Sequence, residues 1–243
     1  MSDLLTDLAS KYCLDKGTGN YPSPTFYNVP EIRYPQSFTP FYNQHLEHHR
    51  QDFKKVLEIG VLFGNSLLFW DEYFPNAKIH GFDIDLSRVL ECAKNFPMMI
   101  GDQSERSDLK RFISVYGDSF DLIIDDGGHK MDQQQISFGY LFEKVKPGGY
   151  FILEDIHTSL SANTESWGIL PDLSNSTLLM LEKYRETGKI NSIHMLAEEI
   201  EYLESNIESC EIYYTQSSGR VNPSVTSIIK KVESNEPCIF YSL

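Results

Sequence analysis

Short apolar runs alternate with amphipathic stretches between residues 54 and 156. The apolar runs, rich in Val, Ile, Leu and Phe, cover residues 55–61, 78–85, 97–102, 120–127 and 148–156. Stretches with a helical pattern lie between them, at residues 66–74, 87–96, 107–116 and 133–145. This alternation predicts βαβ units and a parallel sheet with helices on both faces. Runs as apolar as DLIID are typical of strands buried on both sides.

The C-terminal part breaks this rhythm. Two helical stretches follow each other at residues 177–189 and 194–206, and two strands then follow at residues 210–216 and 225–232. A closing hairpin after five βα units predicts an antiparallel strand at the edge of the sheet. The predicted fold class is therefore α/β, a Rossmann-like doubly wound seven-stranded sheet with an antiparallel C-terminal hairpin strand.

The first 53 residues have a different composition, rich in Tyr, Pro, Asn and His. Five prolines between residues 22 and 40 exclude one long helix there, although residues 4–12 and 41–53 could each form a short one. We interpret residues 1–53 as a lid or cap on a second unit, residues 54–243, that carries the sheet.

Charge and cysteine content narrow the possible partners and compartment. The net charge is −14 and the pI about 4.9, so nucleic acid and membrane surfaces are not expected as partners. Four cysteines lie far apart without a CxxC pair, which favours a reducing cytosol. The N-terminus has no signal-peptide pattern, and no apolar run reaches the roughly 18 residues of a membrane span. We expect a cytoplasmic protein.

The strongest local motif is VLEIGVLFGNS at residues 56–66, where a strand leads into a helix through Gly60 and Gly64. Glycines at such a turn let the backbone approach a ligand closely. The spacing E-x-G-x-x-x-G, which starts at Glu58, is not the dinucleotide fingerprint G-x-G-x-x-G. An ordinary strand–helix turn is one alternative, but the motif disfavours NAD and favours a ligand without phosphates, such as S-adenosylmethionine (SAM).

Polar residues also end the next two strands. Asp83 lies 23 residues after Gly60, where an acidic side chain can accept hydrogen bonds from ribose hydroxyls, and Asp85 is its competitor. Asp102 and Gln103 end the third strand, at the sheet edge where open α/β folds bind ligands. Asp102 could accept a hydrogen bond from the amino group of adenine.

Two further strand ends are strongly acidic, in IIDDGGH and LEDIH. Several carboxylates at one edge repel each other unless a cation or proton intervenes, and hard oxygen ligands suit Mg²⁺, with Mn²⁺ or Ca²⁺ as substitutes. A histidine beside them is a candidate general base, although loop-capping carboxylates and a surface histidine are the alternative. The residues concerned are Asp125, Asp126, His129, Glu154, Asp155 and His157.

These motifs together resemble class I SAM-dependent methyltransferases. More narrowly, the chain is similar to metal-dependent sugar O-methyltransferases of the mycinamicin and macrolide tailoring type. The matching stretches are LDKG, the run from VLEIG to GFDID, GDQS, LIIDDGGH, KPGGYFILEDIHTS and VTSIIKK. We recognise no family motif in residues 160–207, and the chain is much shorter than the macrolide-type enzymes.

The resemblance implies a role for each matching residue. His129 would be the catalytic base that takes the proton from the acceptor hydroxyl, with His157 as its competitor. Mg²⁺ (or Mn²⁺) would be the metal, bound by Asp126, Glu154 and Asp155. SAM would be held by the remaining residues: Glu58, Gly60, Gly64, Asp83, Asp102, Gln103 and Asp125.

The predicted function is therefore a SAM- and divalent-metal-dependent O-methyltransferase. Its partner would be a small-molecule hydroxyl acceptor, a sugar or a glycosylated metabolite, and the chain could form a homo-oligomer. Two alternatives stay open: a cephalosporin-hydroxylase-like enzyme, or a non-catalytic SAM-binding protein on the same scaffold.

Overall fold

The structure is a computed structural model that describes residues 3–18, 21–22, 31–32, 35–159, 173–216 and 223–233. Its strands are β1 (Tyr21–Pro22), β2 (Glu31–Ile32), β3 (Lys55–Ile59), β4 (Lys78–Asp83), β5 (Met98–Ile100), β6 (Phe120–Asp125), β7 (Val145–Leu153), β8 (Ile207–Thr215) and β9 (Ser224–Lys231). Its α-helices are α1 (Leu4–Lys11), α2 (Thr39–Leu46), α3 (Asn65–Tyr73), α4 (Arg106–Tyr116), α5 (Met131–Leu141), α6 (Thr177–Thr187) and α7 (Ala197–Asn206).

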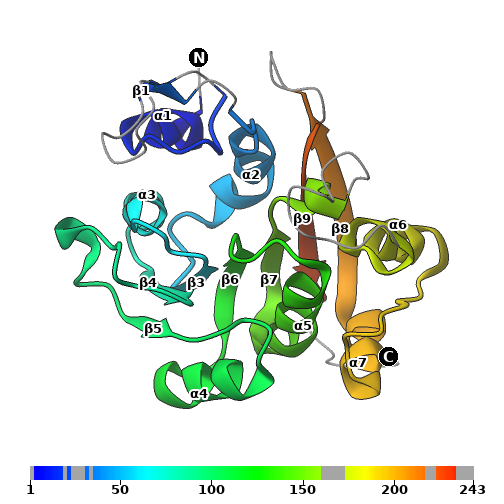
Figure 1. Cartoon of the computed structure of the whole chain (residues 1–243). Coiled ribbons are helices and arrows are strands. Elements are labelled where there is room, and N and C mark those ends of the chain that lie inside the picture. The colour runs from blue at the N-terminus through cyan, green and yellow to red at the C-terminus, as the bar shows by residue number, and fades with distance from the viewer. Residues whose placement is uncertain are drawn as a thin grey trace, which may run out of the picture.

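Seven strands form one twisted sheet in the order β5-β4-β3-β6-β7-β9-β8 (Figure 1). Strands β3 to β7 pair in parallel, whereas β9 pairs antiparallel with both β7 and β8. The order reverses between β3 and β6, which is the switch point where open α/β sheets bind ligands. The predicted doubly wound sheet with an antiparallel C-terminal hairpin strand is confirmed.

Each face of the sheet is covered by its own helices, and alternate residues of the strands serve the two faces. Val56, Leu122 and Ile152 face the cluster built with α1, α2 and α3. Leu57, Ile123 and Phe151 face the cluster built with α4, α5, α6 and α7. Figure 1 shows the two groups of helices on either side of the strands. The central strand β6 is buried throughout, as its apolar sequence predicts.

The described N-terminal residues pack as part of the core. Leu5 and Leu8 of α1 and Tyr42 and Leu46 of α2 are almost fully buried in the cluster that also contains β3 and β6. The predicted helix at residues 4–12 is confirmed. The second helix begins earlier than predicted, at Thr39, and changes to a short 3₁₀ helix at Glu47–His49.

One predicted helix is wrong. Residues 87–96 contain a single 3₁₀ turn, Glu91–Ala93, instead of a helix. Leu90 has an extended backbone and donates its amide to the carbonyl of Phe63, which ties the segment to the turn before α3. The side chain of Ala93 then packs beside Gly64. This tertiary pairing outweighs the local helical preference.

Several sequence-based expectations fall outside the described residues. They concern residues 19–20, 23–30 and 33–34 of the Pro- and Tyr-rich stretch, residues 160–172, and residues 217–222 between β8 and β9. Within the described ranges, none of the helices has the length and apolar character needed to cross a membrane.

Candidate active site

A cavity of about 480 Å³ opens at the carboxyl ends of β3, β4, β5 and β6. One end is formed by the turn after β3 and the residues at the ends of β4 and β5, and the other by the DDGGH loop after β6 and by Asp155, two residues after β7. The predicted site residues that line it are Gly60, Asp83, Asp102, Gln103, Asp126, His129 and Asp155. Glu58, Gly64, Asp125 and Glu154 lie behind this lining.

The two glycines of the turn after β3 serve different ends. Gly60 has a φ of +89°, and a Cβ on it would lie 2.0 Å from the carbonyl oxygen of Asp126. Gly60 therefore lets the turn pass close to the DDGGH loop. Gly64 precedes α3 with a φ of +85°, and a Cβ on it would lie 2.5 Å from the Cβ of Ala93. Gly64 itself does not line the cavity, although Phe63 and Asn65 on either side of it do.

Asp83 organises the turn that forms the cavity wall. Its Oδ2 accepts hydrogen bonds from the amides of Val61 at 2.6 Å and Leu62 at 2.9 Å. Asp85, its predicted competitor, faces solvent and caps its own loop through the amide of Ser87. The side chain of Asp102 likewise accepts bonds from Ser104. The structure thus places Asp83 and Asp102, and not Asp85, in the cavity lining.

Gln103 and Asp125 form a buried support for the DDGGH loop. The two carboxylate oxygens of Asp125 each accept a hydrogen bond from Gln103 Nε2 at 3.0 Å, and Oδ2 also accepts one from Ser137. Gln103 Oε1 in turn accepts the amide of Gly128 at 2.6 Å. Burial raises the pKa of Asp125 to about 6, although the bonds from Ser137 and Gln103 act in the opposite direction. Asp125 therefore acts on the cavity through Gln103.

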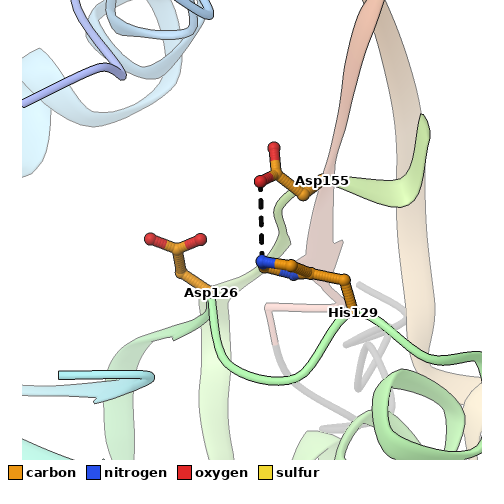
Figure 2. Close-up of side chains that lie close together, drawn as sticks. All are labelled: Asp126, His129 and Asp155. Carbon is orange, nitrogen blue, oxygen red and sulfur yellow. Dashed lines mark ion pairs between the residues drawn. The ribbon is translucent and has the colours of Figure 1, made fainter. Parts of the chain in front are cut away.

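Three side chains converge at the other end of the cavity, as Figure 2 shows: Asp126, His129 and Asp155. Each offers one ligand atom, and these atoms lie within 4.8 Å of one another. His129 Nε2 is 3.6 Å from Asp155 Oδ2. Asp126 and His129 come from the loop after β6, and Asp155 follows β7, because neighbouring parallel strands end at the same edge.

Asp155 is held in an unusual conformation. Its φ of +55° is rare for a residue with a side chain and costs of order 1–3 kcal/mol, a strain that is concentrated at functional sites. Asp155 Oδ1 accepts a bond from Gln36 Nε2 at 2.6 Å and lies 3.5 Å from Nδ1 of His157. His157 thus flanks Asp155 as predicted, but His129 and not His157 lines the cavity.

A lysine that the sequence-based prediction missed lies inside the acidic cluster. Lys16 is 2% exposed, and its Nζ is 2.5 Å from Asp126 Oδ2 and 2.6 Å from Glu154 Oε2. Glu58 is fully buried, 3.9 Å from the same ammonium, and accepts a bond from Trp70 Nε1. The LDKG stretch, part of the family resemblance, was the available signal for Lys16.

Burial governs the electrostatics of this cluster. It raises the pKa of Glu58 to about 7 and that of Asp155 to about 6, against the opposing charges of Lys16 and His129 respectively. The pKa of Glu154 is well above its usual value for the same reason, reinforced by the charge of Asp126. Burial alone would lower the pKa of Lys16, but the charges of Asp126 and Glu154 outweigh it and keep the pKa well above its usual value.

Sequence comparison finds relatives of one kind. No protein-family model matches the chain. The mycinamicin VI 2''-O-methyltransferase of Micromonospora griseorubida is 38% identical over 55% of this chain and 35% of its own length. The demethylmacrocin O-methyltransferase of Streptomyces fradiae is 36% identical over 50% of this chain and 32% of its own length. The aligned part of the chain spans roughly a third of the length of these two curated relatives.

Solved structures extend the similarity to the whole fold. MycE, a methyltransferase from the mycinamycin biosynthetic pathway solved with Mg and S-adenosylhomocysteine (SAH), has a TM-score of 0.70 and 27% identity. The match covers 100% of this chain and 58% of MycE. MycE has also been solved with Mg, SAH and mycinamycin VI. An O-methyltransferase from Bacillus cereus, with a TM-score of 0.56 and 13% identity over 96% of this chain and 92% of its own, shares the fold.

These matches confirm the predicted resemblance and the predicted fold class. The chain has the fold of class I SAM-dependent methyltransferases, and its homologues are sugar O-methyltransferases, among them one from the mycinamycin biosynthetic pathway.

Proposed function

We propose that this chain is a SAM- and divalent-metal-dependent O-methyltransferase that acts on a hydroxyl of a sugar or polyol-bearing small molecule. The observation that carries the proposal is the single cavity that joins the turn after β3 to the cluster of Asp126, His129 and Asp155. Such a cavity can hold a methyl donor and a hydroxyl acceptor next to each other. The names of the relatives support the reaction type and the acceptor class.

SAM would lie along the end of the cavity formed by β3, β4 and β5. Asp83 would bind the ribose hydroxyls and Asp102 the adenine, with Ile84 exposed beside them as an apolar surface for the base. The acidic lining suits a ligand whose sulfonium carries a positive charge. Two further predicted cofactor residues do not line the cavity. Asp125 accepts a hydrogen bond from Gln103, which does line it, and Glu58 lies 3.9 Å from the ammonium of Lys16.

The acidic end of the cavity fits a divalent ion. Asp126 and Asp155 offer carboxylate oxygens within 4.8 Å of each other, and Glu154 Oε1 is buried without a hydrogen-bond partner among the described residues. Mg²⁺ or Mn²⁺ would be held by Asp126, Asp155 and Glu154, because these ions prefer oxygen ligands. Such an ion supplies Lewis-acid activation of a bound hydroxyl and fixes its position.

His129 is the base in this proposal. Mg²⁺ prefers oxygen to imidazole nitrogen, so His129 Nε2 is left to accept the proton of the acceptor hydroxyl. Asp155 Oδ2 lies 3.6 Å from this nitrogen and places a carboxylate next to the positive charge that the ring gains when it takes the proton. The hydroxyl oxygen then attacks the methyl carbon of SAM, the bond from sulfur to that carbon breaks, and SAH leaves. Holding both reactants in one cavity supplies the orientation that such a displacement needs.

Residues 1–53 form the cap over residues 54–243 in this proposal, and they also complete the acidic cluster. Lys16, Gln36 and Tyr42 come from this segment, and the first two contact carboxylates of the cavity. The acceptor would therefore be enclosed partly by the cap.

The test combines binding and turnover. Calorimetry should show that the purified chain binds SAM and SAH and does not bind NAD. The protein should then be incubated with methyl-labelled SAM, Mg²⁺ and a panel of free sugars and glycosylated metabolites, and products should be mapped by mass spectrometry. A label on a sugar oxygen supports the proposal, whereas NAD binding or SAM binding without transfer to any hydroxyl acceptor contradicts it.

A further inference from the structure

A single buried ammonium holds together the carboxylates that would bind the metal. Lys16 Nζ makes two contacts of hydrogen-bond length, with Asp126 Oδ2 at 2.5 Å and Glu154 Oε2 at 2.6 Å, and lies 3.9 Å from Glu58. These three acidic residues belong to β6, β7 and β3 or to the residues that follow them. Lys16 therefore ties three neighbouring strands to the N-terminal segment.

The backbone around Lys16 is fixed, so its ammonium cannot easily leave the cluster. The carbonyl of Lys16 accepts the amides of Phe38 at 2.8 Å and Thr39 at 3.1 Å, at the start of α2. The carbonyl of Asp15 accepts the amide of Gln36. The loop after α1 is thus clamped against the segment before α2, and the side chain is 2% exposed.

The charges explain what this lysine does. Glu58, Asp126, Glu154 and Asp155 are four carboxylates in one buried or half-buried cluster. Carboxylates this close repel one another unless a cation or a proton is present, and uncompensated buried charge is strongly destabilising. A divalent ion relieves this repulsion when it is bound, but the chain must also fold and survive without it.

We propose that Lys16 is a built-in cation of the metal site, a positioning residue that keeps Asp126 and Glu154 together in the metal-free chain by offsetting part of the negative charge that the divalent ion would offset. This inference rests on the proposed function in one respect, that a divalent ion binds here. Asp126 and Glu154 each give one oxygen to Lys16 and keep the other, and the second oxygen of Glu154, Oε1, is buried without a hydrogen-bond partner among the described residues. The chain therefore stays folded in the absence of metal.

The rival explanation is an ordinary structural ion pair, and the dependence on metal separates the two. If Lys16 only attaches the N-terminal segment to the sheet through ion pairs, its loss lowers the stability of the fold equally with and without a divalent ion. If Lys16 stands in for part of the metal's charge, its loss makes the fold depend on the metal. Binding to the native state then stabilises the variant more strongly than the wild type.

The experiment compares thermal and urea unfolding in EDTA and in MgCl₂ or MnCl₂, at matched ionic strength and without SAM. The variants are Lys16→Met, Lys16→Arg and, as a matched control, Lys231→Met, which removes a buried lysine far from the acidic cluster. Lys16→Met should gain markedly more stability from Mn²⁺ than the wild type. By linkage, that corresponds to about tenfold tighter Mn²⁺ binding in a calorimetric titration, since one nearby positive charge is gone.

The controls fix the interpretation. Lys16→Arg should restore the small metal response of the wild type, and Lys231→Met should lose the same stability in EDTA and in metal. Equal metal responses of the wild type and Lys16→Met would overturn the role of Lys16 while leaving the proposed function intact. No metal response in any variant would contradict both.

A double variant keeps the test decisive if Lys16→Met does not fold. Lys16→Met combined with Glu154→Gln removes one charge of each sign, so the remaining repulsion is weaker. The double variant should fold in EDTA and be more stable there than Lys16→Met alone. A double variant that is no more stable than the single one would show that Lys16 is not there to offset the carboxylates.

Discussion

Lys16 and Lys231 are both buried, and they lie at opposite ends of the strands of the same sheet. Lys16 lies at the carboxyl ends of β3, β6 and β7, among carboxylates, next to a cavity of about 480 Å³. Lys231, at the end of β9, lies at the amino end of β7, next to a cavity of about 330 Å³. Its Nζ donates to the carbonyls of Phe142, Glu143 and Val145, at 3.4, 3.0 and 2.6 Å.

The partners of the two ammonium groups decide what each edge can do. Neutral carbonyls compensate Lys231 incompletely, and burial lowers its pKa to about 8. The charges around Lys16 have the opposite effect and raise its pKa. The carbonyls around Lys231 are neutral, whereas Asp126 and Glu154 at Lys16 are acidic and each keep one oxygen that does not contact the ammonium. The carboxyl edge is therefore suited to chemistry and the amino edge to structure.

The largest expected effect of this difference is on turnover. His129→Ala should lower kcat by about 10²–10⁴-fold, the usual cost of removing a general base, while SAM affinity and metal affinity stay close to those of the wild type. Steady-state kinetics with the identified acceptor, together with SAM calorimetry, measures this effect.

His157→Ala is the matched control, because His157 also flanks Asp155 but does not line the cavity. It should change kcat much less. If His157→Ala were the severe variant and His129→Ala the mild one, the two roles would be exchanged.

The next effect is on cofactor binding. Asp83→Ala should weaken SAM binding by about 1–3 kcal/mol, or about fivefold to 150-fold, because ribose hydroxyls and the amides of Val61 and Leu62 lose their acceptor. Asp85→Ala, at an exposed position two residues away, should leave the affinity unchanged. Calorimetric titrations that gave the same SAM affinity for both variants would remove Asp83 from the cofactor site.

The pH dependence of stability should show whether Asp125, which supports the cavity lining through Gln103, is protonated in the folded chain. The folded pKa of Asp125, about 6, is higher than its ordinary value of 3.8, so the folded chain holds this proton more tightly than the unfolded chain. The contribution of Asp125 to the free energy of unfolding in EDTA should therefore fall as pH rises from about 4 to 6, by up to about 3 kcal/mol, and stay constant at higher pH. Asp125→Asn should flatten that decline. If urea unfolding gave the same pH profile for Asp125→Asn and the wild type, Asp125 would be ionised over the whole range.

Replacing Lys231, at the amino ends of the strands, should have the smallest effect on activity. Lys231→Met should lower the free energy of unfolding by about 1–3 kcal/mol, because buried carbonyls lose their donor. The kcat per folded molecule should stay within about twofold of the wild type. A large loss of kcat in a fully folded Lys231→Met protein would break the division between the two edges.

The sequence predicted the carboxyl edge better than it predicted what holds it together. Apolar strands followed by acidic residues locate Asp83, Asp126 and Asp155, because strand periodicity and parallel pairing bring strand ends to one edge. The role of Lys16 could not be read in this way. Its contact with Glu154 spans 138 residues, and no local pattern marks such a pairing.

The same limit explains the helix that was predicted at residues 87–96. Its pattern is helical, but the bond between Leu90 and the carbonyl of Phe63 is a tertiary one. Gly64, likewise, is a packing glycine because Ala93 lies against it, which depends on a segment about 30 residues away along the chain.

The central claim is that this chain transfers a methyl group from SAM to a hydroxyl with the help of a divalent ion at the carboxyl edge. The most direct measurement is methyl transfer from labelled SAM to the identified acceptor after exhaustive chelation, and again after adding Mg²⁺, with SAM affinity measured under both conditions. Chelation should abolish transfer, Mg²⁺ should restore it, and SAM affinity should change little. Undiminished transfer in the chelated protein would contradict it.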